Sequence, residues 1–288
     1  MSSILVTGSN GQVGSEIKEL SSDYTYTFFF SNREELDITD KEAIEKFIKN
    51  NKIDMIINCG AYTAVDRAED EQELADRVNH LATKNLGEVA KEHSLTLIHI
   101  STDYVFDGRN FRPYIETDNT NPNGIYGKTK LDGERALQNI NPQNSIIIRT
   151  SWVYSSFGAN FVKTMLRLGK ERDSLGVIFD QVGTPTYARD LARTILEILP
   201  KIENSDVEIY HYSNEGVLSW YDFAKEIMRM AKLECSINPI ETKEYPTPAT
   251  RPHYSLLNKA KIKEQFNITI SFWKDSLDAC LTTMGERK

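Results

Sequence analysis

The sequence predicts an α/β fold, in which a doubly wound parallel sheet forms one domain and a smaller α/β lobe forms another. Three observations predict it. Short apolar segments alternate with longer amphipathic ones through the first half of the chain. Several apolar segments are nearly continuous, as expected for strands buried on both faces of a parallel sheet. The length of 288 residues also suits about two domains.

Five strands are predicted in the first half, where segments are short and rich in β-branched or aromatic residues: 4–7, 26–30, 55–58, 95–101 and 146–150. Four amphipathic segments between them predict helices: 12–20, 41–50, 71–93 and 126–139. We expect Asp40 to cap the second helix and the acidic run 66–73 to be a solvated helix start. Residues 1–150 are therefore expected to form the sheet domain.

The second half of the chain is less regular. Helices are predicted at 161–170, 188–199, 220–232 and 273–284, and strands at 177–179 and 207–212. Four prolines at 239, 246, 248 and 252 predict an ordered surface loop, because proline interrupts a helix. Residues 151–288 are expected to form mainly the lobe, with segments near 177–215 partly returning to the sheet domain.

Composition excludes several classes of protein. Lys and Arg number 34 against 42 Asp and Glu, so a net charge of −8 gives no support to nucleic-acid or anionic-membrane binding. No apolar segment reaches the ~20 residues that span a bilayer, and no signal peptide precedes the first strand. Three scattered cysteines and five histidines without ligand spacing predict neither a disulfide framework nor a metal site. We expect a soluble cytoplasmic protein.

A glycine-rich turn directly follows the first predicted strand. Glycines at positions 8, 11 and 14 let the backbone approach a pyrophosphate, and the helix that follows offers free N–H groups to that anion. This arrangement predicts a Rossmann dinucleotide site. The residues of the turn that we expect to bind the cofactor are Gly8, Asn10, Gly11, Gln12, Val13 and Gly14.

The end of the second strand bears on which dinucleotide binds. An NAD enzyme usually has an acidic residue there for the ribose 2′-OH, whereas this chain has Ser31 and Arg33. Because a guanidinium binds phosphate oxygens well, NADPH is favoured, with NADH as the alternative. Asp37 and Ile38 are expected near the adenine, or else are residues of a solvated helix entry.

Tyr126 and Lys130 stand four residues apart at the start of a predicted helix, which places them on one face. We expect the lysine cation to lower the pKa of the phenol and so to help it exchange a proton at neutral pH. Tyr126 and Lys130 are also expected to bind the cofactor, with Lys130 donating to its ribose hydroxyls. Thr102, at the end of the preceding strand, is expected to hold a substrate carbonyl, with Ser101 as the competing candidate. Together these residues predict an oxidoreductase.

These features resemble the extended short-chain dehydrogenases/reductases and, more narrowly, the family of dTDP-4-dehydrorhamnose reductases. The segments that carry the resemblance are TGSNGQVG (7–14), NCGAYTAVD (58–66), STDYVFDG (101–108), YGKTKLDGE (126–134), RTSWVY (149–154), NFV (160–162), DQVGTPT (180–186) and RPHYS (251–255). The resemblance implies reduction of the C4 keto group of dTDP-4-dehydro-L-rhamnose to dTDP-L-rhamnose.

The resemblance also implies residue roles. Thr102, Tyr126 and Lys130 match the catalytic triad, and Tyr126 would donate a proton to O4 as hydride arrives at C4. Further matches are Ala61, Tyr62 and Thr63 at the cofactor, Val65, Tyr104 and Trp152 at the sugar, and Asn160 and Arg251 at the nucleotide diphosphate. Some members of the family bind Mg²⁺ through acidic residues that build a dimer. This sequence has no compact carboxylate cluster, so Mg²⁺ dependence and the choice between monomer and homodimer stay open.

Two other functions are compatible with the fold. One is a nucleotide-sugar epimerase or dehydratase that retains NAD, against which the missing acidic residue after the second strand counts. The other is a non-catalytic regulator, resembling the regulatory subunit of methionine adenosyltransferase. The presence of Thr102, Tyr126 and Lys130 together argues against a protein without catalytic activity.

Overall fold

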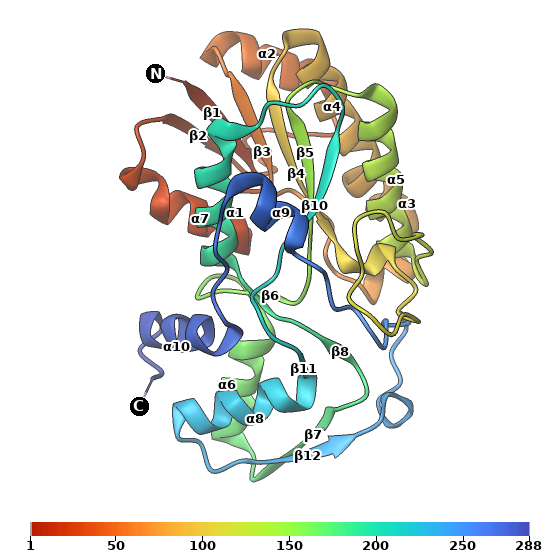
Figure 1. Ribbon diagram of the computed structural model, residues 1–288, viewed down its shortest axis with the longest axis vertical. Coiled ribbons are helices and arrows are strands. Elements are labelled where there is room, and N and C mark those ends of the chain that lie inside the picture. The colour runs from red at the N-terminus through yellow and green to blue at the C-terminus, as the bar shows by residue number, and fades with distance from the viewer. Residues whose placement is uncertain (1, 288) are drawn as a thin grey trace.

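A six-stranded parallel sheet forms the centre of the computed structural model, which describes residues 2–287 (Figure 1). Its strand order is β10-β5-β4-β3-β1-β2, and every neighbouring pair is parallel. The strands are β1 (Ser3–Thr7), β2 (Thr27–Ser31), β3 (Met55–Asn58), β4 (Thr96–Thr102), β5 (Ser145–Thr150) and β10 (Glu208–His211). The predicted fold class, a doubly wound Rossmann sheet, is confirmed.

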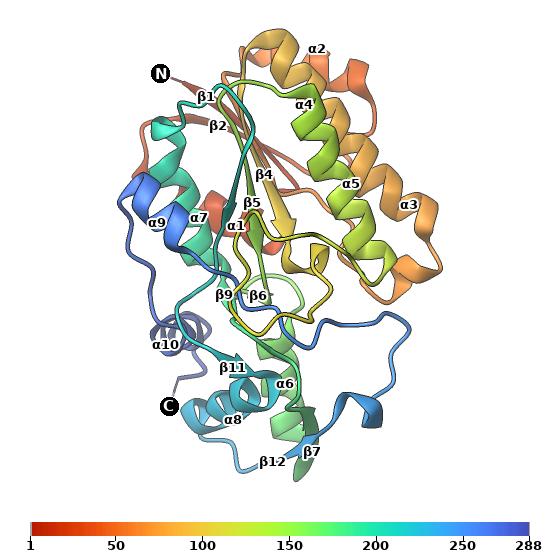
Figure 2. The same ribbon diagram turned by 45° about the vertical axis from the view of Figure 1, so that its right-hand side comes forward.

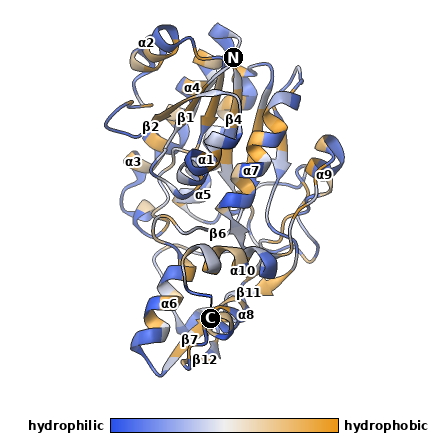
Figure 3. Ribbon diagram, turned by 90° about the vertical axis from the view of Figure 1, so that its left-hand side faces the viewer, coloured by the Kyte–Doolittle hydropathy of each residue, from blue (hydrophilic) through white to orange (hydrophobic). Residues whose placement is uncertain are grey.

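Helices cover both faces of this sheet because successive strand residues point to opposite sides. Ile4 and Val6 pack with α1 (Gln12–Leu20) and α7 (Ala188–Ile198), whereas Leu5 packs on the other face. That second face carries α2 (Lys41–Asn51), α4 (Ala82–His93) and α5 (Ile125–Ile140). Figure 3 shows the hydrophobic residues concentrated on the strands and on the helix sides turned toward them.

The lobe lies beyond the carboxyl ends of the strands (Figure 2). Its core joins α6 (Phe161–Glu171), α8 (Trp220–Ala231) and α10 (Trp273–Thr283). Three short pairs complete it: β7 (Ser174–Ile178) with β12 (Ser236–Ile240), β8 (Val182–Gly183) with β11 (Leu218–Ser219), and β6 (Val153–Tyr154) with β9 (Thr186–Tyr187). Both α7 and β10 come from the second half of the sequence yet lie with the sheet. The division of the chain into two domains stays a prediction.

Most predicted elements agree with the structure within a few residues, two predictions differ, and one helix and several short strands of the lobe were not predicted. The helix predicted at 71–93 is divided into α3 (Gln72–Asp76), a π-helical segment Arg77–Leu81 and α4. Pro239, predicted to lie in a loop, is part of β12. Helix α9 (Ala260–Phe266), which packs Phe266 against Tyr210, was not predicted. No described helix is long and apolar enough to cross a membrane.

The acidic run 66–73 makes structural contacts that the sequence did not predict. Asp40 caps α2 as predicted, by accepting a hydrogen bond from the Ala43 amide at 3.1 Å. The run is not a simple solvated helix start, however, because Asp66 pairs with Arg251 at 2.7 Å and Glu69 accepts the Ile125 amide at 2.9 Å. These carboxylates therefore hold the C-terminal loop and the start of α5 in place.

Candidate active site

The glycine-rich turn is shaped for a close backbone approach. Gly8 has a φ of +65°, and a Cβ atom added there would lie 2.6 Å from the Gly60 nitrogen. Only glycine therefore fits at this position. Gly11 is the N-cap of α1 and supplies no side chain to the first free N–H groups of that helix. The turn thus presents an unblocked helix N-terminus, which suits a pyrophosphate.

A cavity of about 420 Å³ opens beside this turn, at the carboxyl ends of β1, β2 and β3. Seven of the predicted cofactor residues line it: Gly8, Gly11, Arg33, Asp37, Ile38, Ala61 and Tyr62. The other predicted cofactor residues do not line it: Asn10, Gln12, Val13, Gly14, Ser31, Thr63, Tyr126 and Lys130. Arg77 does, and sequence reasoning missed it because it lies in the π-helical segment. This cavity and the turn together fit a dinucleotide cofactor.

Three side chains near the predicted 2′-phosphate position, Arg33, Ser31 and Asp37, differ in their hydrogen bonds and ion pairs. Arg33 is exposed and makes no ion pair with any residue between 2 and 287. Ser31 is buried, and its hydroxyl has no hydrogen-bond partner in that part of the chain. Asp37 accepts hydrogen bonds from the amide and hydroxyl of Thr39, which lower the pKa of its carboxyl. A guanidinium is therefore available at this edge of the cavity.

Thr102 and Tyr126 come together where β4 ends and α5 begins. The Thr102 hydroxyl donates to Asp103 Oδ1 at 3.1 Å and accepts from the Tyr104 amide at 3.2 Å. The nearness of Thr102 to Tyr126 partly offsets the rise in the pKa of the phenol. Tyr104 lies edge-on against Tyr126, with ring centroids 5.4 Å apart. Gly127 makes this approach possible, because a Cβ atom there would clash with the Tyr104 carbonyl oxygen. The structure thus gathers three of the predicted residues.

Desolvation raises the pKa of Tyr126 to about 12. We expected the Lys130 cation to lower it, and that expectation is wrong for this structure. Lys130 Nζ donates to the Ile100 carbonyl at 2.7 Å and faces His99 Nε2 at 3.2 Å. Burial lowers the pKa of Lys130 itself to about 8. Tyr126 is therefore protonated at neutral pH, as a proton donor must be.

A buried ion pair fixes α5 against the sheet. Glu134 accepts three hydrogen bonds from Arg149, at 2.7 to 3.2 Å, and both side chains are almost fully buried. Ser101, the competing candidate for holding the substrate, donates to the same carboxylate at 2.5 Å. Its hydroxyl is thereby committed to the buried ion pair, whereas the hydroxyl of Thr102 lies beside Tyr126 and donates to Asp103.

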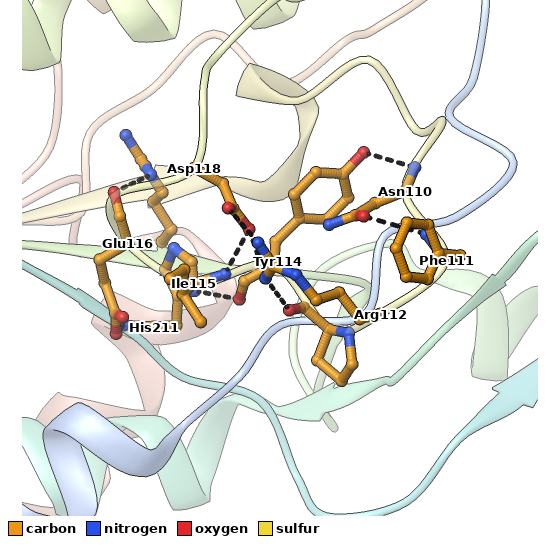
Figure 4. Close-up of polar contacts among 10 residues, drawn as sticks. Asn110, Phe111, Arg112, Tyr114, Ile115, Glu116, Asp118 and His211 are labelled. Carbon is orange, nitrogen blue, oxygen red and sulfur yellow. Dashed lines mark hydrogen bonds and ion pairs between the residues drawn. The ribbon is translucent and has the colours of Figure 1, made fainter.

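The loop between Thr102 and Tyr126 is held by its own polar contacts, as Figure 4 shows. Arg112 makes two hydrogen bonds to Asp118, at 2.7 and 3.0 Å. Glu116 accepts the amide of His211 at 3.1 Å, and the His211 ring contacts the Tyr114 carbonyl at 3.1 Å. Because His211 belongs to β10, these contacts attach the loop to the edge of the sheet.

Aromatic residues of the lobe pack against one another near the end of β5. Trp152 has a φ of +49°, an unusual conformation for a bulky residue, and stacks on Trp220 at 3.7 Å between ring centroids. Trp220 and Phe161 also line a second cavity, of about 780 Å³, which extends into the lobe. Arg251 lines the same cavity, whereas Trp152 and Val65 do not.

Asn160 and Arg251, the two residues predicted to bind the diphosphate, both form polar contacts with other residues of the chain. Asn160 caps α6 through the Lys163 amide at 3.1 Å and donates to Gln12 Oε1 at 3.0 Å. Arg251 is half-buried and pairs with both oxygens of Asp66, at 2.7 and 2.9 Å. Asn160 therefore joins the lobe to the glycine-rich turn, and Arg251 joins the C-terminal loop to the segment after β3. Across residues 2–287, no three His, Cys, Asp or Glu side chains gather into a possible metal site.

Comparison with known proteins gives a full-length match. The family described as the RmlD substrate binding domain matches residues 1–286. A dTDP-4-dehydrorhamnose reductase of Aggregatibacter actinomycetemcomitans is 43% identical, with 96% of this chain and 97% of that protein covered. The protein of the same name from Escherichia coli is 39% identical, with 94% of each covered.

Solved structures of similarly named proteins resemble this chain over nearly its whole length. A dTDP-4-dehydrorhamnose reductase from Clostridium acetobutylicum has a TM-score of 0.94 at 40% identity, with 98% of this chain and 99% of that chain covered. The Bacillus anthracis reductase, solved in complex with NADP, has a TM-score of 0.93 at 35% identity, covering 98% and 100%. A UDP-glucose 4-epimerase from Brucella ovis, at 16% identity and a TM-score of 0.83, shares the fold alone.

Proposed function

The chain belongs to the RmlD substrate binding domain family, and from that membership we propose that it reduces dTDP-4-dehydro-L-rhamnose to dTDP-L-rhamnose with NADPH. The observation that carries the proposal is the position of Thr102 and Tyr126. They lie together at the carboxyl edge of the sheet, beside a turn that fits a dinucleotide. Relatives named for this activity match the chain over nearly its whole length.

The reaction adds a hydride and a proton across the C4 carbonyl. NADPH, when bound, supplies the hydride to C4. Thr102 turns its hydroxyl from Asp103 to hold the carbonyl oxygen by a hydrogen bond, and Tyr126 donates the phenolic proton to O4 as charge develops there. The raised pKa of Tyr126 keeps that proton in place until the hydride arrives. Lys130 is proposed to bind the ribose hydroxyls of the cofactor and to stabilise the phenolate that remains.

Arg33 is proposed to select NADPH over NADH. Replacing it with alanine is expected to raise the KM for NADPH about 10- to 100-fold, the value of one or two charge-assisted hydrogen bonds. The KM for NADH is expected to change little, because NADH lacks the 2′-phosphate. The measurement is steady-state kinetics with both cofactors, and Arg135→Ala, an exposed arginine on α5, is the control. An unchanged NADPH preference in Arg33→Ala would refute this role.

The lobe is proposed to bind the nucleotide half of the substrate. The cavity of about 780 Å³ has an aromatic side, formed by Trp220 and Phe161, and a cationic edge at Arg251. Those features suit a base and a diphosphate. Trp152 and Tyr104 would contact the sugar between this cavity and Tyr126.

Arg251 and its partner Asp66 provide a matched test of that proposal. Arg251→Gln is expected to raise the KM for the sugar nucleotide at least about tenfold, because it removes a cation from the diphosphate. Asp66→Asn breaks the same ion pair but keeps the cation, so a much smaller rise is expected. Equal effects of the two variants on the KM would show that Arg251 is only a structural link.

The competing functions make different predictions in one assay. Protein, NADPH and enzymatically made dTDP-4-dehydro-L-rhamnose are mixed, and the absorbance of the reduced cofactor is followed. A reductase consumes NADPH in proportion to the product, whereas an epimerase that retains NAD or a non-catalytic regulator consumes none. Absence of consumption would overturn the proposal. We propose that the reaction takes place in the cytoplasm, where NADPH is available.

A further inference from the structure

A buried row of polar side chains crosses the sheet behind Lys130. Thr7, Asn58 and His99 face one another in the registers of β1 with β3 and of β3 with β4. The Thr7 hydroxyl donates to Asn58 Oδ1 at 2.7 Å, and Asn58 Nδ2 lies 2.9 Å from His99 Nδ1. His99 Nε2 lies 3.2 Å from Lys130 Nζ. The row is therefore continuous from β1 to α5.

The direction of every hydrogen bond in this row is set by one backbone group. The Gly60 N–H can only donate, and it lies 3.1 Å from Asn58 Oδ1. The Asn58 oxygen must therefore face Gly60 and Thr7, so its NH₂ group faces His99. His99 Nδ1 must accept from that NH₂ group, which leaves the ring proton on Nε2. Burial lowers the pKa of His99 well below its usual value and so excludes the doubly protonated ring.

This tautomer determines which form of Lys130 fits. His99 Nε2–H points at Nζ, so the contact is a hydrogen bond only when the amine is neutral and offers its lone pair. An ammonium group would place two donors against each other, although it could still donate to the Ile100 carbonyl. Burial acts in the same direction, since it lowers the pKa of Lys130 to about 8. The ammonium therefore predominates at pH 7 and the neutral amine predominates above pH 8.

The other ionisable groups around Lys130 do not change this conclusion. The Cys59 thiol, which follows β3, is neutral because desolvation raises its pKa to about 12. Glu134 lies one turn further along α5, and its charge is paired with Arg149. Tyr126 lies one turn before Lys130 and is protonated at neutral pH.

We propose that His99 is a positioning residue whose Nε2–H stabilises the neutral amine of Lys130 against β4, and that it thereby sets the pH above which Lys130 no longer serves as an ammonium toward the cofactor ribose and Tyr126. The first half of this proposal concerns the cofactor-free chain alone, and the second half rests on the proposed function.

The first test is the tautomer of His99 in the native, cofactor-free protein. Long-range ¹H–¹⁵N correlation spectra of histidine-labelled protein distinguish the two ring nitrogens, and the signal of His99 is the one lost in His99→Asn. We expect the Nε2–H form at neutral pH. An Nδ1–H form or an imidazolium would overturn the proposal, whatever the enzyme reduces.

The second test is a pair of variants that separate the two ring nitrogens. His99→Asn keeps an acceptor near Nδ1 but loses the donor to Lys130, whereas His99→Gln places an amide N–H near the position of Nε2. Losing the donor raises the pKa of Lys130, and activity is lost as the pH rises through that pKa. The basic limb of kcat/KM should therefore lie near pH 8 in the native enzyme, about one pH unit higher in His99→Asn, and near the native value in His99→Gln. Identical limbs in the native enzyme and His99→Asn would contradict the proposal.

Discussion

Replacing Tyr126 with phenylalanine is expected to lower kcat about 100- to 10,000-fold, the usual contribution of a positioned general acid. The substitution removes the proton that O4 receives and changes little else. Tyr126 contacts Tyr104 through its ring, which phenylalanine retains. The affinity for NADPH should therefore stay within about twofold, as measured by fluorescence titration.

The control for this variant is Tyr221→Phe, on helix α8 of the lobe. It removes a phenol outside the site and should leave kcat unchanged. Single-turnover kinetics would separate the chemical step from product release. If Tyr126→Phe turned over at the native rate, Tyr126 would not be the proton donor.

Replacing Glu134 with glutamine is expected to lower the free energy of unfolding by about 3–5 kcal/mol, because it leaves the buried Arg149 charge without a partner. The same carboxylate also accepts the Ser101 hydroxyl, so the change reaches the segment that ends in Thr102. Urea denaturation followed by circular dichroism measures the loss.

Asp132→Asn on the same helix is the matched control. It breaks the exposed pair between Lys128 and Asp132, whose atoms are 2.8 Å apart, and should cost at most about 1 kcal/mol. The combined change of Glu134→Leu and Arg149→Met should recover much of the loss, because neither buried charge remains. A Glu134→Gln variant as stable as Asp132→Asn would show that the buried pair does not hold α5 in place.

Features that depend on neighbouring residues were predictable from the sequence. The turn from Gly8 to Gly14 needs glycine for local backbone reasons, and the Asp40 cap needs only the residues that follow it. The approach of Thr102 to Tyr126 follows from where a strand ends and the next helix begins. The lobe was harder to predict, because its strands β6, β8, β9 and β11 have only two residues each and leave almost no pattern.

Features that depend on packing between distant segments were not predictable. His99 has no motif around it, and its role follows from the registers that place it beside Asn58 and near Lys130. Arg77 reaches the cofactor cavity because of a π-helical segment, which an amphipathic pattern does not reveal. The direction of Lys130, toward His99 instead of Tyr126, was missed for the same reason.

The transfer of hydride to the sugar is tested most directly by isotope labelling. The protein is incubated with dTDP-4-dehydro-L-rhamnose and NADPH that carries deuterium at the transferable position of the nicotinamide, and the sugar nucleotide is analysed by mass spectrometry and NMR. We expect dTDP-L-rhamnose with one deuterium at C4, formed in step with cofactor oxidation. A sugar nucleotide without deuterium at C4, or a cofactor that is not oxidised, would contradict it.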